Sequence, residues 1–216
     1  MKKISWLGIM MCVLMSASVF GIDTVVPNTN VNPGTTTVQI PINIDNAAGV
    51  VGFQFTVTFD NSVLNATGAV AGSLTNGWLL QVNPQAGQIS VIGASSTALG
   101  SVSGSLSILQ FNVVGNPADT TNLTFTVHKL SDFNAQQIAH TATNGTFHIN
   151  GYSISGKVTL SGGTGKVTDT VLTLEQVPVK ATTKPDTQGN YSFTDLPRGT
   201  YTITPQLSGY AFNPLN

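Results

Sequence analysis

The sequence has few charged residues and only one cysteine. Charged side chains make up 8% of its 216 residues, against about a quarter in an average soluble protein. Eight lysines and arginines nearly balance nine aspartates and glutamates, and neither half of the chain carries a basic stripe. Because nucleic acid binding requires clustered cations that displace counterions from phosphates, this composition argues against a nucleic-acid partner.

Hydrophobic runs long enough to cross a membrane are also lacking beyond the N-terminus. There, Lys2 and Lys3 precede an apolar run from Ile4 to about Phe20, and Gly21 supplies a small residue for cleavage. A short positive start, an apolar run and a small residue are typical of a secretion signal. We therefore predict a signal peptide over residues 1–21 and no membrane span in the mature chain.

The single cysteine, Cys12, lies inside this predicted signal. The mature chain should then contain no thiol and no disulfide bond. A lipid anchor on Cys12 would require a small residue before it, whereas Met11 occupies that position. We expect the protein to be secreted, or held at the cell surface by other means.

From Ile22 onward, hydrophobic residues recur with a period of two, which is typical of strands that bury one face. Turn-forming Gly, Pro and Asn residues separate the runs, as they do in a β-sandwich. Pro41 cannot donate to a ladder, so we predict an edge strand or a bulge there and prefer the edge. The predicted strands of the first half cover residues 38–44, 53–59, 88–94, 105–113, 122–130 and 145–149.

A break at residues 150–152 separates this series from a second one. We therefore predict two domains, at residues 22–150 and 151–216. The second is close to the lower size limit for a domain that folds alone, and it stops abruptly at Asn216. We expect that its closing strand is missing and that the chain is a fragment of a longer protein. Its predicted strands cover residues 154–160, 171–174, 177–182, 191–193 and 201–205.

Several segments of the first domain follow one another in a distinctive order. The strand GFQFTVTFDNSVL, residues 52–64, is followed by GSLTNGW, GQISVIGASS, GSLSILQFNV and NGTFHI. Asp60 and Asn61 are suited to cap the turn after this strand, while Val63 and Leu64 return to the core. In this order, the segments resemble a cohesin domain.

This resemblance implies a fold and a binding function. Cohesins are jelly-roll-like sandwiches of nine strands that dock a dockerin, usually a calcium-loaded helical pair, on one open sheet face; related sandwiches bind polysaccharide. In cellulosomal cohesins the strand matching residues 52–60 presents an Asn and an Asp to the partner, whereas Gly52 and Gln54 stand at these positions here. The difference argues against ordinary cellulosomal docking. We predict that Gly52, Gln54, Thr56 and Thr58 contact the partner.

The second domain contains ISGKVTLSGG and then DTQGNYSFTDLPRGTYTITPQLSGY. These segments resemble a carboxypeptidase-regulatory-like or prealbumin-like domain of bacterial surface proteins. The resemblance implies a smaller, Ig/prealbumin-like β-sandwich that serves as a spacer or a carbohydrate-binding-like module. Within it we predict a hairpin turn at Gln188-Gly189-Asn190 and inward-pointing Tyr191 and Phe193.

Metal-binding or acid–base chemistry has few candidates in this sequence. His128, His140 and His148, with Asp119 and Asp132, could in principle form such a cluster. No pair of these histidines has the ligand spacing of a helix or a strand. We expect solvated surface histidines, no metal and no cofactor.

Hydrolytic chemistry is equally poorly supported. The segment GSVSG at residues 100–104 does not place Ser103 at the centre of a nucleophile elbow. The first domain has no glutamate from which to build a pair of catalytic carboxylates. Calcium held by Asp45, Asp60 and Asn61 is an alternative to turn-stabilising hydrogen bonds, which are the simpler account.

Sugar binding would require exposed, flat aromatic rings. Trp78 is the only tryptophan after the predicted signal, and its apolar neighbours favour packing in the core. Tyr152 and Tyr210 are the remaining exposed candidates, and a lone ring is a weak signal.

Taken together, these patterns predict an all-β, non-catalytic surface or scaffold protein with a dockerin-like protein partner in a polysaccharide-related system. The alternative is a polysaccharide-binding accessory module or an adhesin stalk. An enzyme is the least supported of the three.

Overall fold

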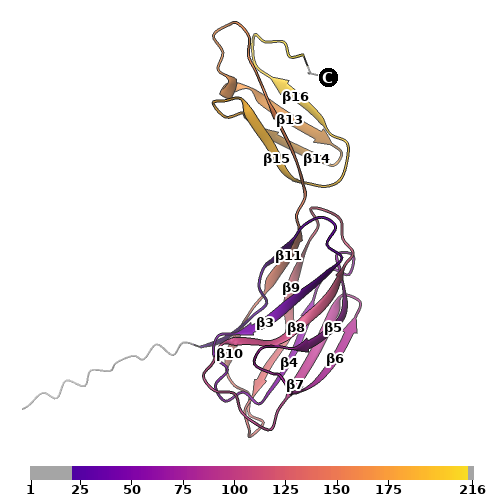
Figure 1. The fold of residues 1–216 in the computed structure, drawn as a ribbon, viewed down its shortest axis with the longest axis vertical. Helices are drawn as coiled ribbons and strands as arrows, with labels where there is room; N and C mark the ends of the chain where they lie inside the picture. Colours follow the sequence, from indigo (N-terminus) through magenta and orange to yellow (C-terminus); the bar gives the residue numbers. More distant parts are fainter. Residues whose placement is uncertain (1–20, 214–216) are drawn as a thin grey trace, which may run out of the picture.

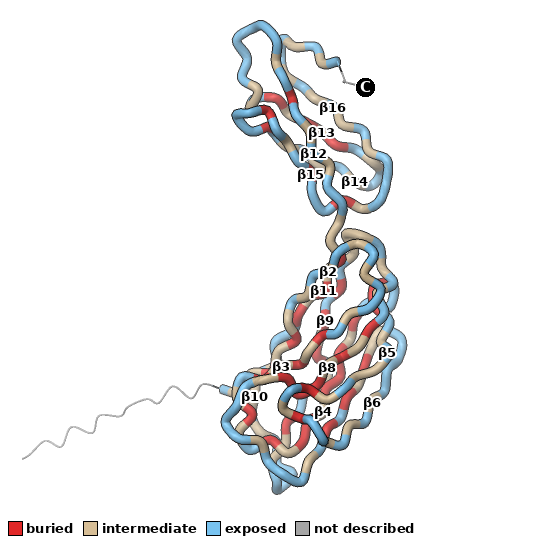
Figure 2. Tube along the Cα trace, viewed as in Figure 1, coloured by how far each residue is buried: buried red, intermediate tan, exposed pale blue. Residues whose placement is uncertain are grey.

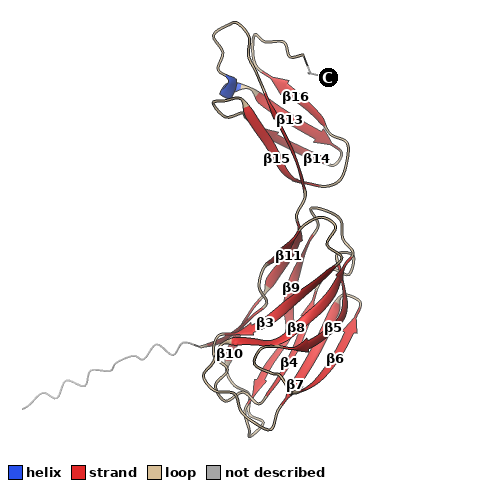
Figure 3. Ribbon diagram, in the orientation of Figure 1, coloured by secondary structure: helices blue, strands red, loops and turns tan. Residues whose placement is uncertain are grey.

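The computed structural model describes residues 21–213 and consists of two β-sandwiches (Figure 1). Among these residues the one helix is a short 3-10 turn, Val167–Asp169, so the predicted all-β class is confirmed (Figure 3). The predicted signal peptide, apart from Gly21, lies outside the described residues.

The first sandwich contains a five-stranded and a six-stranded sheet. The order of the five-stranded sheet is β10 (His140–Thr143), β1 (Ile22–Val25), β3 (Thr37–Ile44), β8 (Gly104–Val113) and β5 (Leu64–Ala71). The order of the six-stranded sheet is β2 (Thr29–Val31), β11 (Gly145–Ile149), β9 (Thr120–Ser131), β4 (Gly52–Thr58), β7 (Gln88–Ala94) and β6 (Leu79–Gln85). Strand pairing is antiparallel except between β1 and β10 and between β2 and β11.

The core of this sandwich is built by alternation along the strands (Figure 2). On β4 the side chains of Phe53, Phe55 and Val57 are buried between the sheets. The ring of Phe55 lies 5.1 Å from that of Phe53 and 5.6 Å from that of Phe125, measured between centroids. Such aromatic pairs add to the free energy gained by burying their apolar area.

The preferred placement of Pro41 on an edge strand is wrong. Its strand, β3, is the central strand of the five-stranded sheet. The pairing of β1 with β3 covers only Asn43 and Ile44, so no β1 residue lies opposite Pro41. The missing N–H therefore breaks no ladder on that side, and a register shift follows directly between Ile42 and Asn43. The bulge therefore lies beside Pro41 and not at it, because the extra residue is Leu106 of β8 and Pro41 itself is paired with Ile108.

The second sandwich pairs β12 (Tyr152–Lys157) with β15 (Asn190–Leu196). Its other sheet has the order β14 (Val179–Thr183), β13 (Val171–Gln176) and β16 (Thr202–Gln206). The small core consists of Val158, Leu172, Leu174, Phe193 and Leu196.

The predicted hairpin at Gln188-Gly189-Asn190 is wrong, because this turn joins β14 to β15 and these strands lie in different sheets. The Asp186 carboxylate accepts hydrogen bonds from the backbone N–H groups of Gln188 at 2.9 Å and Asn190 at 2.8 Å. Such a turn reverses the chain without pairing the strands that flank it.

The connection between the two sandwiches is short and anchored on both sides. Only Asn150 and Gly151 lie between β11 and β12. The Asn150 N–H donates to the Val31 carbonyl at 2.8 Å, and the Gly151 N–H donates to the Asp195 carboxylate at 2.7 Å. A Cβ at Gly151 would lie 2.3 Å from the Asp195 carbonyl carbon, so glycine permits this close approach.

His148 takes part in the same connection, which corrects the expectation of a solvated histidine. Its Nε2 lies 2.9 Å from Asp195 Oδ1, and its Nδ1 lies 2.7 Å from the Thr120 hydroxyl. Its side chain is 20% exposed. Asp195 thus contacts the first sandwich through His148 and the connection through Gly151.

We expect Phe55→Ala to lower the free energy of unfolding of the first sandwich by about 3–5 kcal/mol, because Phe55 is fully buried. Urea unfolding followed by the fluorescence of Trp78 measures this change. Phe133→Ala is the matched control: its ring is 69% exposed, so a change above about 0.5 kcal/mol there would contradict the assignment of the core.

We expect Asp195→Ala to loosen the connection between the sandwiches, because it removes the acceptor shared by His148 and Gly151. Residual dipolar couplings test this: the two sandwiches should share one alignment tensor in the native chain and differ in the variant. Asp195→Asn keeps an acceptor oxygen and tolerates the left-handed backbone at φ 58°, so it should restore the shared tensor. Equal tensors in the alanine variant would refute the anchoring role.

Candidate functional site

The four predicted contact residues lie on one face of the first sandwich. Gly52, Gln54, Thr56 and Thr58 alternate along β4 with buried side chains, so they face outward from the six-stranded sheet. Gly52 and Thr56 have little exposed surface, whereas Gln54 and Thr58 are half-buried. The structure thus brings the four together, while their contact with a partner stays a prediction.

The neighbouring strands place apolar side chains beside these residues on the same outer face. Ile92 of β7 lies opposite Gln54, and Ala94 lies opposite Gly52. Leu79 of β6 lies opposite Ala94. Leu79 is 79% exposed and Ile92 is 42% exposed. Sequence reasoning missed both, because only the strand register places them on this face.

The outer face carries almost no charge. On strands β6, β7, β4 and β9, Lys129 is the only Lys, Arg, Asp or Glu residue. It lies opposite Gln54 and is exposed. We call the outward-facing residues of these four strands the neutral face.

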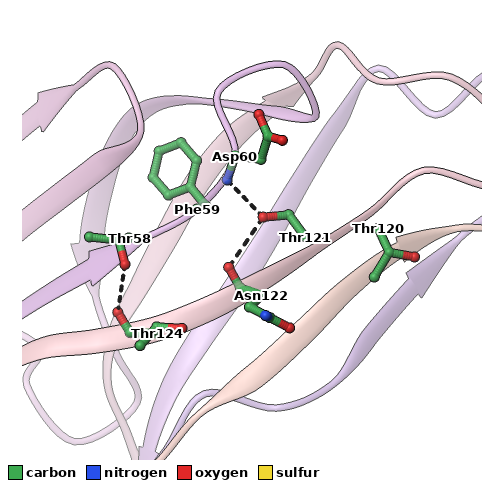
Figure 4. Close-up of a pocket in the computed structure, with 7 residues that line it drawn as sticks. All are labelled: Thr58, Phe59, Asp60, Thr120, Thr121, Asn122 and Thr124. Atoms are coloured by element: carbon green, nitrogen blue, oxygen red, sulfur yellow. Dashed lines mark hydrogen bonds between the residues drawn. The ribbon is translucent and has the colours of Figure 1, made fainter.

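A shallow pocket of about 380 Å³ lies at the end of β4, against the start of β9 (Figure 4). The backbone N–H of Asp60 donates to the Thr121 hydroxyl at 2.7 Å, and that hydroxyl donates to the Asn122 carbonyl at 3.2 Å. The Thr58 hydroxyl donates to the Thr124 carbonyl at 3.3 Å. The pocket lining contains no nucleophile paired with a general base.

Asp60 caps the turn after β4, as predicted. Its carboxylate accepts hydrogen bonds from the Ser62 hydroxyl at 2.6 Å and from the Ser62 N–H at 2.8 Å. These bonds favour the charged form and lower the pKa of Asp60 below its ordinary value. Asp45 instead accepts a hydrogen bond from the Asp23 N–H at 2.8 Å. Within residues 21–213, no group of three or more His, Cys, Asp or Glu could hold a metal ion.

The aromatic candidates do not form a sugar-stacking platform. Trp78 is half-buried, packs against the core and stacks on Phe53 at a centroid distance of 6.0 Å. Tyr152 is 46% exposed. The Tyr210 hydroxyl donates to the Gly162 carbonyl and accepts from the Gly165 N–H, both at 2.9 Å, and its ring lines a second pocket of about 510 Å³ in the second sandwich.

Two of the three histidines lie together, which the sequence did not indicate. His128 Nδ1 lies 3.1 Å from His140 Nε2, although the two residues are 12 positions apart. Their sequence spacing gave no sign of this contact; His128 is exposed, as expected for a solvated histidine, whereas His140 is half-buried. The third histidine, His148, binds Thr120 and Asp195 instead.

The family of the first sandwich follows from its sequence. A model of the cohesin domain matches residues 22–149. The chain belongs to the cohesin family. A model of the second β-sandwich domain of the NOMO1-like BOS complex subunit matches residues 147–215. The predicted cohesin domain followed by a second β-sandwich is therefore confirmed.

Solved cohesins share this fold. A non-cellulosomal cohesin from the archaeon Archaeoglobus fulgidus is 26% identical, with a TM-score of 0.53, over 60% of this chain and 91% of its own. The sixth cohesin of scaffoldin B from Acetivibrio cellulolyticus, solved with a mutant Cel5 dockerin, is 21% identical, with a TM-score of 0.54, over 60% and 99%. The OlpA cohesin from Clostridium thermocellum, also in a dockerin complex, is 15% identical, with a TM-score of 0.52, over 60% and 99%.

No curated protein sequence matches the chain. Among the residues that the structure describes, no helix has both the length and the apolar character needed to cross a membrane.

We expect Ser62→Ala to raise the pKa of Asp60 toward its ordinary value, because the hydroxyl hydrogen bond is the largest cause of the lowering. A lowered pKa stabilises the fold above the ordinary value, and this stabilisation is lost as the pH falls through the folded-state pKa. The variant should therefore gain less from this carboxylate, and the loss of that gain should be complete at a higher pH than in the native chain. Titration of the carboxyl carbon by NMR measures the shift.

Asp186 is the internal control for this titration. Its pKa is lowered by hydrogen bonds from Asn190, in the second sandwich. Ser62→Ala should leave that pKa unchanged, and a parallel rise at Asp186 would show that the substitution acts through the whole fold.

Proposed function

We propose that this cohesin-family chain is an exported, non-catalytic surface or scaffold protein. Its first sandwich docks a dockerin-like protein on the neutral face, within a polysaccharide-related system. Two structurally similar cohesins, from Acetivibrio cellulolyticus and Clostridium thermocellum, are solved in complex with dockerins. The predicted signal peptide supports export.

The observation that carries this proposal is the composition of the neutral face. Leu79 and Ile92 are exposed there beside β4, and Lys129 is the only charged side chain. Exposed apolar side chains that are surrounded by neutral polar ones are typical of the centre of a protein–protein interface, where charged residues are depleted. A partner that covers these two side chains would remove their apolar area from water.

The predicted contact residues have different roles in this proposal. Gln54 makes no side-chain hydrogen bond within residues 21–213, so its amide remains available to a partner. Gly52 is buried, and a Cβ there would lie 2.7 Å from the Ser131 hydroxyl oxygen, so the glycine accommodates Ser131 on this face. The hydroxyls of Thr56 and Thr58 already bind Ser90 and Thr124, so they shape the surface more than they bond to the partner.

Polysaccharide binding is the alternative, and the aromatic residues favour it less. Phe133 and Tyr152 are exposed aromatic rings, but Phe133 lies in a loop of the first sandwich and Tyr152 begins the second. The ring of Trp78 is stacked on that of Phe53, so this ring face cannot stack on a sugar. Stacking on a pyranose needs accessible, flat rings, and the two exposed rings here belong to different sandwiches.

The second sandwich serves as a spacer in this proposal. It continues directly from β11 through a connection of two anchored residues. This connection limits how far the neutral face can turn relative to the second sandwich.

The test is binding by the purified chain. Immobilised dockerins, including the Cel5 dockerin and that of the OlpA complex, are compared with affinity gels of soluble and insoluble glycans. The proposal expects saturable retention by a dockerin. Retention on a glycan without binding to any dockerin would reject it in favour of the polysaccharide-binding alternative.

We expect Ile92→Lys to weaken binding of the retained dockerin by about tenfold or more, because a charge would be buried in an apolar contact. Val70→Lys is the matched control, since Val70 is also 42% exposed but lies on β5 in the opposite sheet. Surface plasmon resonance measures both variants. An equal loss of affinity in the two variants would show that the dockerin does not bind the neutral face.

A further inference from the structure

His128 and His140 bridge the two sheets of the first sandwich. His128 lies on β9 of the six-stranded sheet, and His140 is the first residue of β10 in the five-stranded sheet. Their rings are nearly perpendicular, at 88°, with centroids 5.1 Å apart. Neither histidine is among the four predicted contact residues.

The hydrogen bonds assign the protons on this pair. His140 Nδ1 lies 2.9 Å from the Ile138 carbonyl oxygen, which can only accept, so Nδ1 carries the proton. His140 Nε2 then presents its lone pair toward His128 Nδ1, 3.1 Å away. Histidines that bind metals usually donate their other N–H to a carbonyl or a carboxylate in this way, which fixes the ring and its tautomer.

The separation of the two nitrogens suits a metal ion. Two imidazole nitrogens that are each about 2.0–2.1 Å from a tetrahedral ion lie about 3.3 Å apart. The observed 3.1 Å is close to this value. An ion at that distance from both nitrogens lies about 1.3 Å off the line that joins them. The exposed His128 and the half-buried His140 would therefore each rotate to turn their lone pairs toward it.

We infer that His128 and His140 form a two-nitrogen site for a divalent transition metal. Imidazole ligands suit Cu²⁺, Ni²⁺ and Zn²⁺, and Cu²⁺ should bind most tightly of the three. Within residues 21–213 no third His, Cys, Asp or Glu joins the pair, so water completes the coordination. The bound ion cross-links β9 to β10 and thereby fastens the two sheets together.

The experiment is titration of the purified mature chain, without a histidine tag, with Cu²⁺. Calorimetry should show one ion per chain, and electron paramagnetic resonance should show coupling to two nitrogens. His128→Gln and His140→Gln should each weaken the binding by at least about tenfold, because one of two nitrogen ligands is lost. His148→Gln is the control and should bind as the native chain does.

A second measurement does not depend on Cu²⁺. Ni²⁺ should raise the Tm of the native chain, because an ion that binds only the folded state stabilises it, and it should not raise the Tm of either Gln variant. Circular dichroism without metal confirms that the variants fold. Unchanged Cu²⁺ affinity in the double variant, or coupling to a single nitrogen in the native chain, would overturn the inference.

Discussion

The burial of alternate side chains on β4 determines which residues of this strand the first sandwich presents to its surroundings. Phe53, Phe55 and Val57 fill the space between the sheets, and a slip of one residue would turn them outward. A close contact across the sheet opposes that slip: a Cβ on Gly93 would lie 2.3 Å from the Phe53 ring. One aromatic ring and one glycine together hold Gln54 on the neutral face.

The strands that were predictable are those with sustained alternation. The predicted residues 53–59 and 88–94 correspond closely to β4 and β7. The strands β1, β2 and β10 have four residues or fewer, too few for a period to be recognised. β5 is interrupted by Gly and Ala, and β6 contains Pro84 and an outward Leu79. In such strands tertiary pairing outweighs the local pattern.

The candidate site was predictable along one strand only. The outward positions of β4 follow from its alternation and from the resemblance to cohesins. Ile92 and Leu79 required the register of β7 and β6, which local sequence does not encode. His128 and His140 meet across two sheets, and His148 meets Asp195 across two sandwiches, 47 residues away. Such contacts depend on how whole sheets and domains pack, so no spacing rule could find them.

The scarcity of charge on the neutral face has a kinetic consequence. Long-range electrostatic attraction accelerates the encounter of two proteins, and salt screens it. With Lys129 as its only charged side chain, this face exerts little such attraction. A protein that docks there should associate at an unsteered rate, on the order of 10⁵–10⁶ M⁻¹s⁻¹, that is nearly independent of ionic strength. Differences in affinity between partners must then come from differences in the dissociation rate of each complex.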